Sequence, residues 1–501
     1  MAFDANEAIK TALAGGDRSR LGTKLPVRER LELLCDPRSF VEDGLLARAL
    51  DDRLPTDGVI TGTGKIDGRS VAIIAHDPTV KAGSWGGPTV EKQIRLLERA
   101  DLDMLPVIYL VDSAGGRLTE QLDFFPGRRG AARIFDLQVR LSGRVPQLCC
   151  LFGPSAAGGA YMPAFCDWVA MVDKNASMSL ASPRIAEIVN GEVTSNEEMG
   201  GARMHTTVSG SGDELCPDDE SAILLLRRCF SYLPSSFKER PAIVEAFDPA
   251  TTLVEGVIPD DERTGYDVRN VIDGLVDDAS FFEIKEKFAP EMVIGFARLE
   301  GMCVGIVANQ PSVRSGAIFV DSADKAARFI VWCDAFNIPL LYLVDVPGFM
   351  VGADVERQGI IRHGAKMVSA MSSGEVPKFC VVLRRAYAAG YYAMASPGFR
   401  PRATIALPTA QIAAMGDAAA VNAVYANHIA AITDDAERAA FIEEKREEYR
   451  SSLGLLRLAS DLHIDAVVPP QYLRAELVER LVAASGWTRE VDRRHHGVWP
   501  V

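Results

Sequence analysis

The stretch GPSAAGGAYMPA, from Gly153 to Ala164, decides the fold because it places a turn of small residues directly after an apolar segment. The preceding residues, PQLCCLF, have the composition of a buried strand, and the following residues are compatible with a helix. A similar stretch, RRAYAAGYYAMA from Arg384 to Ala395, follows the apolar segment KFCVVL. Two turns of this kind, each at a strand end, indicate that one structural unit occurs twice.

Other segments repeat in the same order at nearly one spacing. IDGRSVAIIAHD resembles LEGMCVGIVANQ, VIYLVDSAGG resembles LLYLVDVPGF, and AAGGAYM resembles AAGYYAM. The residues that pair are Gly68 with Gly301 and Asp112 with Asp345, at an offset of 233, and Gly158 with Gly390, at an offset of 232. We therefore predict two copies of one domain, residues 1–245 and 246–501, with the polar, proline-containing segment 235–252 as the linker.

The pattern within each copy predicts an α/β fold. Asp67-Gly68 has the signature of a type I′ hairpin turn between two strands. Apolar segments then alternate with segments of helical spacing, which is typical of parallel, buried strands covered by helices. The segment GVITGTGK resembles a phosphate-binding loop only weakly, because Ile66 stands where that motif needs Ser or Thr.

Composition limits the possible functions. The 501 residues carry a formal net charge of −14, which disfavours nucleic-acid binding. We found no apolar run long enough to cross a membrane and no apolar N-terminal leader, so we expect a cytoplasmic protein without membrane contact. The nine cysteines form no C-x-x-C pair, and we expect no metal site; most cysteines lie in apolar runs and are expected to be buried.

The two turns also suggest chemistry. Gly and Ala leave backbone N–H groups accessible to a ligand oxygen, and a turn of this kind can stabilise a developing oxyanion. The alternative is a tight packing turn without a ligand. Asp112 and Asp345, at strand ends, are either catalytic carboxylates or structural caps, and His205 and His363 are isolated in the sequence.

These turns, together with EEMGGARMHTTVSGSGD, VGIVANQPSVRSGAI, CDAFNIPLLYLVDVPGFMVG and GIIRHGAKM, resemble the carboxyltransferase (β) subunits of biotin-dependent acyl-CoA carboxylases over nearly the whole chain. The resemblance implies two tandem crotonase-like (ClpP/crotonase) domains. It also implies a homohexamer whose active sites lie between the first domain of one subunit and the second domain of another. A separate biotin carboxylase and a biotin carboxyl carrier are the implied partners.

The family mechanism implies which residues act here. Acyl-CoA binds mainly to the first domain and carboxybiotin, on its carrier, mainly to the second. Carboxybiotin releases CO2, the freed ureido nitrogen takes the α-proton, and the thioester enolate attacks CO2. The implied site residues are Gly158, Gly159, Ala389 and Gly390 for the oxyanions, Tyr161, Tyr391 and Tyr392 for the acyl pocket, Arg128, Arg129 and Arg133 for coenzyme A, and Val346, Pro347 and Gly348 for biotin.

The second turn departs from the family pattern. Propionyl- and acetyl-type enzymes typically read YGGAYDVM, whereas this chain reads YAAGYYAM, with Tyr392 where the family's acyl-selecting residue stands. The chain also lacks an A-M-K-M biotinylation motif and an ATP-binding glycine loop. The open alternatives are a biotin-dependent acyl-CoA decarboxylase α subunit, a stand-alone crotonase-type hydratase or hydrolase, and a non-catalytic scaffold of a carboxylase complex.

Overall fold

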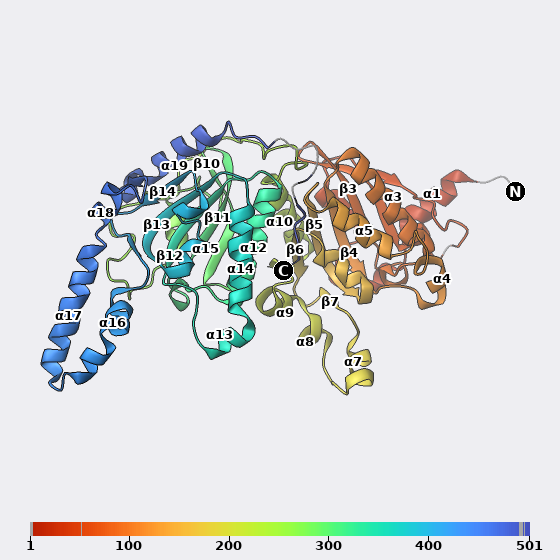
Figure 1. Cartoon of the computed structure of the whole chain (residues 1–501). Helices are drawn as coiled ribbons and strands as arrows, with labels where there is room; N and C mark the ends of the chain where they lie inside the picture. Colours follow the sequence, from red (N-terminus) through yellow and green to blue (C-terminus); the bar gives the residue numbers. More distant parts are fainter. Residues whose placement is uncertain (1–3, 52, 490–493, 495, 501) are drawn as a thin grey trace.

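Two eight-stranded sheets lie side by side, one in each half of the chain (Figure 1). The structure, a computed structural model, describes residues 4–51, 53–489, 494 and 496–500. The first sheet has the strand order β1-β2-β3-β4-β5-β6-β8, with β7 paired to β5, and the second has the order β9-β10-β11-β12-β13-β14-β16, with β15 paired to β13. Each strand therefore has its counterpart eight strands later, which confirms the α/β fold and the predicted duplication.

The elements alternate as the sequence predicts. The strands of the first half are β1 (Val41–Asp43), β2 (Val59–Ile66), β3 (Arg69–His76), β4 (Val107–Ser113), β5 (Gln147–Ala156), β6 (Trp168–Val172), β7 (Ser177–Ser179) and β8 (Glu214–Cys216). Its helices are α1 (Ala5–Ala14), α2 (Val27–Leu34), α3 (Gly87–Asp103), α4 (Gln121–Phe124), α5 (Ala132–Leu141), α6 (Tyr161–Ala164), α7 (Pro183–Asn190), α8 (Asn196–Gly200), α9 (Ala202–Met204) and α10 (Asp219–Ser231).

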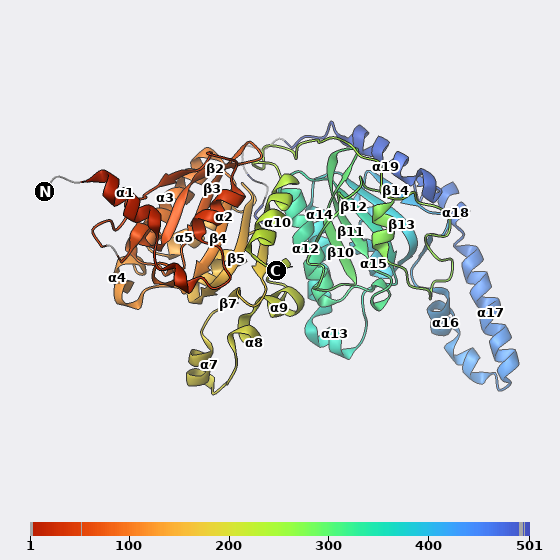
Figure 2. The same ribbon diagram turned by 180° about the vertical axis from the view of Figure 1, so that it is seen from behind.

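The second half follows the same plan and adds a helical extension. Its strands are β9 (Phe282–Ile284), β10 (Met292–Leu299), β11 (Met302–Asn309), β12 (Leu340–Val346), β13 (Lys378–Tyr387), β14 (Ala403–Ala406), β15 (Gln411–Ala413) and β16 (Ala466–Val467). Its helices are α11 (Val268–Asp273), α12 (Val320–Ala335), α13 (Ala353–Gln358), α14 (Ile360–Ser373), α15 (Ala388–Ala393), α16 (Asp417–Ala431), α17 (Asp435–Ser452), α18 (Leu455–Ser460) and α19 (Pro470–Ala484). The helices α16 and α17 project from the body of this half (Figures 1 and 2).

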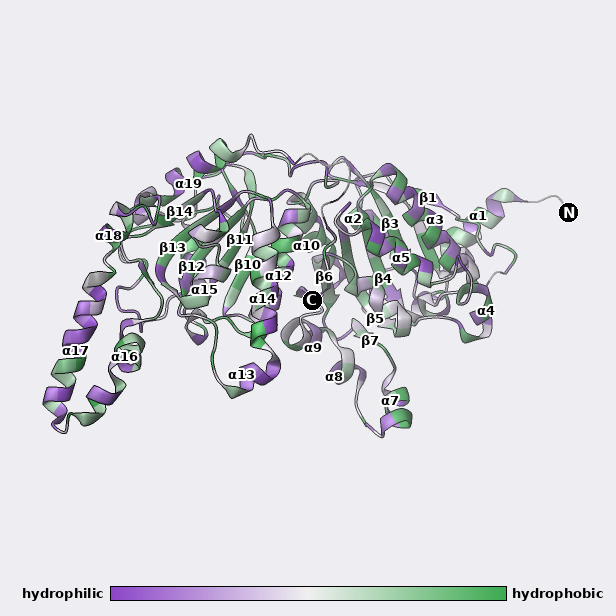
Figure 3. Cartoon of the chain, in the orientation of Figure 1, coloured by the Kyte–Doolittle hydropathy of each residue, from purple (hydrophilic) through white to green (hydrophobic). Residues whose placement is uncertain are grey.

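Local chemistry accounts for the sheets. Asp67 and Gly68 both have positive φ (50° and 79°), as a type I′ turn requires, and Glu300 and Gly301 repeat this turn in the second half. The strands that follow each hairpin pair in parallel and are buried on both faces, so Val, Ile and Leu dominate them, as the hydropathy colours show (Figure 3). The segment GVITGTGK is part of this hairpin and not a phosphate-binding loop, because all of its residues after Gly58 lie in strand β2.

A shared apolar seam joins the two halves. Helix α10 lies between the sheets in both views (Figures 1 and 2). Trp168 from the first half and Phe282 from the second lie with their ring centroids 6.2 Å apart, within one core cluster that contains residues of both halves. The C-terminal segment returns to the first half, where the Val498 N–H donates to Ser142 Oγ at 2.9 Å. The halves are therefore held together by packing as well as by the linker.

The sheet registers correct one detail of the repeat. In the first half Ser113 lies opposite Ser155, and in the second half Val346 lies opposite Ala386. The strands that carry the two turns are thus related by an offset of 231 residues, not 232. Gly158 corresponds to Ala389 and Gly159 to Gly390, because the connection between the strands is two residues shorter in the second half.

Two general expectations can be compared with the fold. All nine cysteines are buried free thiols, as their apolar surroundings predicted. In the described part of the chain, no helix is both long enough and apolar enough to span a bilayer.

Candidate functional site

The two small-residue turns have the same backbone geometry. Strand β5 ends at Ala156, and Ala157 then adopts a left-handed conformation with φ of 55°. Strand β13 ends at Tyr387, and Ala388 repeats this conformation with φ of 53°. A left-handed alanine is uncommon and costs free energy, so its occurrence at both equivalent positions marks a feature that the fold maintains. Each turn lies where a central parallel strand ends.

The first turn leaves space beside Gly158 and does not need glycine at either of its two glycine positions. A β-carbon added to Gly158 would meet only Phe135 Cζ, at 4.0 Å, and one added to Gly159 would meet Ser155 Oγ at 3.7 Å and Trp85 Cζ2 at 3.9 Å. Neither glycine has positive φ, so neither packing nor backbone conformation requires glycine here. Because Gly158 is also exposed, the bare backbone is available to a ligand. The interpretation as a packing turn therefore does not account for this pair.

The second turn is built differently. A β-carbon at Gly390 would lie 2.8 Å from Gly348 Cα and 2.9 Å from Val346 Cγ2, so protein packing does require glycine at this position. The same contacts place Val346 and Gly348, two of the residues expected to bind biotin, against the turn. Ala388 and Ala389 are exposed. The accessible backbone of this turn is thus at its two alanines.

The three tyrosines assigned to the acyl pocket separate in the structure. Tyr161 and Tyr392 occupy equivalent positions in the two halves and are 44% and 56% exposed. Tyr391 is only 7% exposed and belongs to the main core cluster, and burial raises the pKa of its hydroxyl. Its ring is therefore packed in the protein core and does not line an open pocket.

Of the arginines assigned to coenzyme A, Arg128 and Arg129 are exposed and Arg133 is half-buried, and two of the three form ion pairs. Arg129 donates to Glu91 and Glu98 of α3 at 2.8–3.2 Å, and Arg133 pairs with Asp136. Within the described residues, Arg128 has no ion-pair partner. Arg128 is therefore the cation of this group whose charge is not already balanced.

The strand-end aspartates are structural. Asp112 is buried and receives hydrogen bonds from Lys24 Nζ at 2.8 and 3.0 Å, with Arg30 at 3.4 Å. Asp345 is buried between Arg384 and Arg385, which donate at 3.0 and 2.6 Å. Buried carboxylates need such partners, and this pairing removes both groups from consideration as general bases.

Two histidines that stand alone in the sequence also have structural partners. The Nε2 atom of His205 lies 2.8 Å from the Met178 carbonyl oxygen, and its Nδ1 atom lies 2.7 Å from Ser209 Oγ. The Nδ1 atom of His363 lies 2.8 Å from both carboxylate oxygens of Asp324. Among the described residues, no group of three His, Cys, Asp or Glu side chains is arranged to hold a metal ion.

The sequence did not reveal the side chains beneath the first turn. The Trp85 indole N–H donates to His76 Nε2 at 3.1 Å, and the two rings are stacked with centroids 6.1 Å apart. Burial lowers the pKa of His76 to about 4, so its imidazole is neutral and can accept this bond. On the other side, the aromatic rings of Phe135, Tyr161 and Phe165 lie within 6.2 Å of one another. Only the spacing of Tyr161 and Phe165, four residues apart on one helical face, hinted at this cluster.

A duplicated α/β fold with a left-handed, small-residue turn at the end of each central strand defines a two-domain enzyme of the crotonase-like type. Residues 20–499 match the model of the carboxyl transferase domain family. The chain belongs to this family, and it is a carboxyltransferase.

Relatives and solved structures agree with this assignment. An uncharacterised carboxylase of Bacillus subtilis (strain 168) is 57% identical over 95% of this chain and 94% of its own length. The carboxyltransferase subunit of propionyl-CoA carboxylase from Haloferax mediterranei is 38% identical over 99% of this chain and 98% of its own length. The structure of the transcarboxylase 12S hexamer with methylmalonyl-coenzyme A bound has a TM-score of 0.92 and 36% identity, and covers 100% of this chain and 99% of its own.

Proposed function

We propose that this chain is the carboxyltransferase (β) subunit of a biotin-dependent acyl-CoA carboxylase, with its reaction at the two small-residue turns. The observation that carries the proposal is the exposed backbone of Gly158, where an added β-carbon would meet only Phe135 Cζ, at 4.0 Å. Family membership over residues 20–499 supports the reaction class. No observation favours the decarboxylase, the hydratase or hydrolase, or the scaffold.

The chain's own contribution is electrostatic. The backbone N–H groups of Gly158 and Gly159 stabilise the thioester oxygen of acyl-CoA as negative charge develops on it during loss of the α-proton. The N–H groups of Ala389 and Gly390 serve the other reactant, next to Pro347 and Gly348. Carboxybiotin, when bound there, supplies the carboxyl group. No side-chain base is needed, in agreement with the burial and pairing of Asp112 and Asp345.

We propose that one complete site combines the first turn of one copy with the second turn of another, within a hexamer. The two turns of a single chain belong to separate sheets, which supports this arrangement. Tyr161 and Tyr392, both exposed at equivalent positions, then line the acyl pocket, and Arg128 offers its unbalanced charge to the phosphates of coenzyme A. The proposed boundary between residues 245 and 246 falls within the segment 232–267, which lies between α10 and α11 and contains no helix or strand.

Carboxyl transfer to free biotin tests the proposal. The purified chain is incubated with free biotin and a panel of carboxylated acyl-CoAs, and the loss of the acyl-linked carboxyl group is followed. We expect biotin-dependent turnover with at least one acyl-CoA. The scaffold alternative predicts no turnover with any of them.

Dependence on partners is tested separately. We expect the purified chain to form no carboxylated product from ATP, bicarbonate and acyl-CoA until a biotin carboxylase and a biotinylated carrier are added. Activity of the chain alone with ATP and bicarbonate would contradict the proposed division of labour.

A further inference from the structure

A basic hollow lies at the start of strand β13, whereas the second turn of the proposed reaction site follows the end of this strand. Its volume is about 680 Å³. It is lined by the end of α14, the start of β13, the loop before β14 and the segment after α19. Strand β13 begins with Lys378 in this hollow and ends at Tyr387 beside the second turn. Ten residues of strand span roughly 30 Å, so the hollow is remote from the catalytic turns.

Cations outnumber carboxylates in the lining. Lys378, Arg400, Arg402 and Arg489 face one carboxylate, Glu375. Arg489 already donates to Glu375 at 2.8 Å and to the buried Asp334 at 2.8 Å. In the described part of the chain, neither Arg400 nor Arg402 forms an ion pair, and both are exposed. Among the described residues, no carboxylate therefore pairs with these two positive charges.

Lys378 is a third cation in the lining of the hollow, and it lies near Arg400. Lys378 is buried, and its Nζ donates to the carbonyl oxygens of Met371 and Gly374 at 2.7 and 3.3 Å. Burial lowers the pKa of Lys378, and the nearby positive charge of Arg400 lowers it further. The positive charges of this cluster repel one another. A bound anion would reduce that repulsion, so the cluster favours the binding of an anion. The planar guanidinium group of arginine can donate two parallel hydrogen bonds to the oxygens of a phosphate group.

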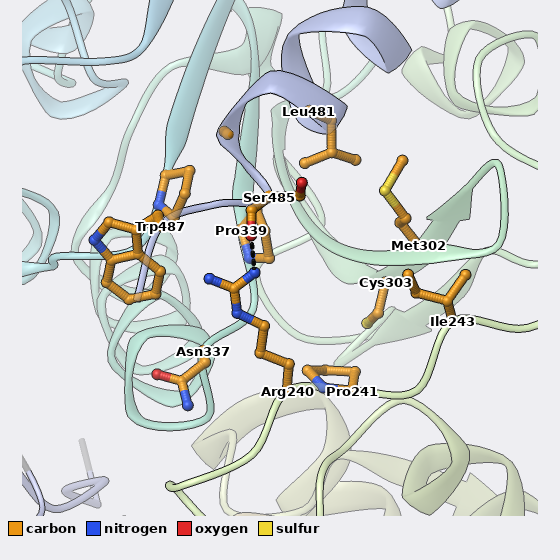
Figure 4. Close-up of a pocket in the computed structure, with 12 residues that line it drawn as sticks. Arg240, Pro241, Ile243, Met302, Cys303, Asn337, Pro339, Leu481, Ser485 and Trp487 are labelled. Atoms are coloured by element: carbon orange, nitrogen blue, oxygen red, sulfur yellow. Dashed lines mark hydrogen bonds between the residues drawn. The ribbon is translucent and has the colours of Figure 1, made fainter. Parts of the chain in front are cut away.

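The hollow has an aromatic wall formed by Trp487. This indole also borders an apolar pocket lined by residues of the linker, β11, α19 and the loops before β12 and β13 (Figure 4). There the Arg240 side chain extends past the ring and donates to the Ser485 carbonyl, with its guanidinium carbon 5.7 Å from the ring centroid. A flat, partly exposed ring next to clustered arginines suits a ligand that combines phosphates with a planar base.

We propose that this hollow binds a nucleoside polyphosphate, with the phosphates at Arg400 and Arg402 and the base against Trp487. The same chemistry occurs in a free nucleotide and in the nucleotide part of coenzyme A. The volume is within the range of small-molecule sites and far exceeds the space that a single phosphate needs. The site lies outside the proposed reaction centre, so it adds a second ligand to the function proposed above.

Calorimetric titration of the assembled protein tests this site with three probes: ATP, coenzyme A without an acyl group, and inorganic pyrophosphate. Coenzyme A is also expected to bind at the proposed reaction site, so only binding that depends on Arg400 and Arg402 reports on this hollow. We expect ATP, coenzyme A or both to bind in this way, and the tighter of the two identifies the source. The double variant Arg400→Ala/Arg402→Ala should weaken that binding about tenfold or more. The control Lys10→Ala/Arg457→Ala, which removes two exposed cations elsewhere, should leave it unchanged.

Trp487→Phe should keep most of the affinity, and Trp487→Ala should lose several-fold, because only the first retains an aromatic wall. Carboxyl transfer to free biotin should stay within about twofold of the parent in all of these variants, which separates this proposal from the proposed function. Three results would overturn the site: no binding of ATP or coenzyme A, binding that is indifferent to the double variant, or pyrophosphate binding as tightly as either nucleotide.

Discussion

Gly390 and Gly348 approach so closely that a β-carbon on Gly390 would lie 2.8 Å from the Gly348 Cα atom. Real β-carbons do not tolerate this distance to backbone, so Gly390→Ala must displace either the turn or the end of β12. Overpacking of this kind costs about 1–3 kcal/mol. We expect Gly390→Ala to lower the free energy of unfolding by that amount, measured by urea denaturation, and to impair carboxyl transfer because the second turn moves.

Gly398→Ala is the matched control for this change. Gly398 lies eight residues further along the chain and has no positive φ, and a β-carbon added to it would meet no atom within 4 Å. This variant should unfold at the same urea concentration as the parent. If Gly390→Ala were equally stable, the close contact with Gly348 would not fix the position of the turn.

At the first turn, we expect a substitution to reduce activity while leaving stability almost unchanged. Gly158→Val places its side chain in open space, with Phe135 as the nearest neighbour, so stability should change by less than about 0.5 kcal/mol. The side chain then occupies the space through which a ligand oxygen reaches the N–H groups. We expect kcat/KM for transfer to biotin to fall by about 10² or more, the size of effect seen when an oxyanion donor is lost. Gly454→Val, at another open glycine, should leave both quantities unchanged, and full activity of Gly158→Val would remove this turn from the site.

Much of this architecture was predictable because its causes are local. Apolar segments, a type I′ turn at Asp67-Gly68 and small residues at two strand ends are enough to indicate duplicated α/β halves. The offset of the turns was wrong by one residue, because short sequence matches cannot place a gap that the pairing of β12 with β13 determines. The burial of Tyr391 beside the exposed Tyr392 depends on how α15 is seated, and the engagement of Arg129 depends on α3. Such contacts between distant segments leave no trace in one sequence.

Tyr392 should influence which acyl-CoA reacts. Its side chain is 56% exposed at the position equivalent to Tyr161, and the ring is 6.4 Å from that of Phe399. Tyr392→Asp replaces an aromatic wall by a shorter, charged one, which should disfavour longer apolar acyl groups. We expect the ratio of kcat/KM between a short and a long acyl-CoA to change about tenfold or more. Tyr472→Asp, at an exposed tyrosine on α19, serves as control, and an unchanged ratio for Tyr392→Asp would exclude this residue from the acyl pocket.

The seam between the two halves should make stability depend on pH. Burial, together with the negative charges of Asp213, Glu286 and Glu283, raises the pKa of Glu214, on β8, from 4.5 to about 8, while Lys285 opposes this shift. Between these two pH values the folded chain holds a proton that the unfolded chain has released. Stability from this group is therefore present at low pH and is lost as the pH rises from about 5 to 8.

Glu214→Gln removes this titration and keeps the size of the side chain. We expect the free energy of unfolding of the parent to fall relative to the variant as the pH rises through this range, by at most about 1.4 kcal/mol per pH unit. Glu255→Gln, at an exposed position, should follow the parent at every pH. Because the comparison is a difference between variants, the titration of other buried groups cancels. Parallel curves for the parent and Glu214→Gln would show that Glu214 is ionised in the folded protein throughout this range.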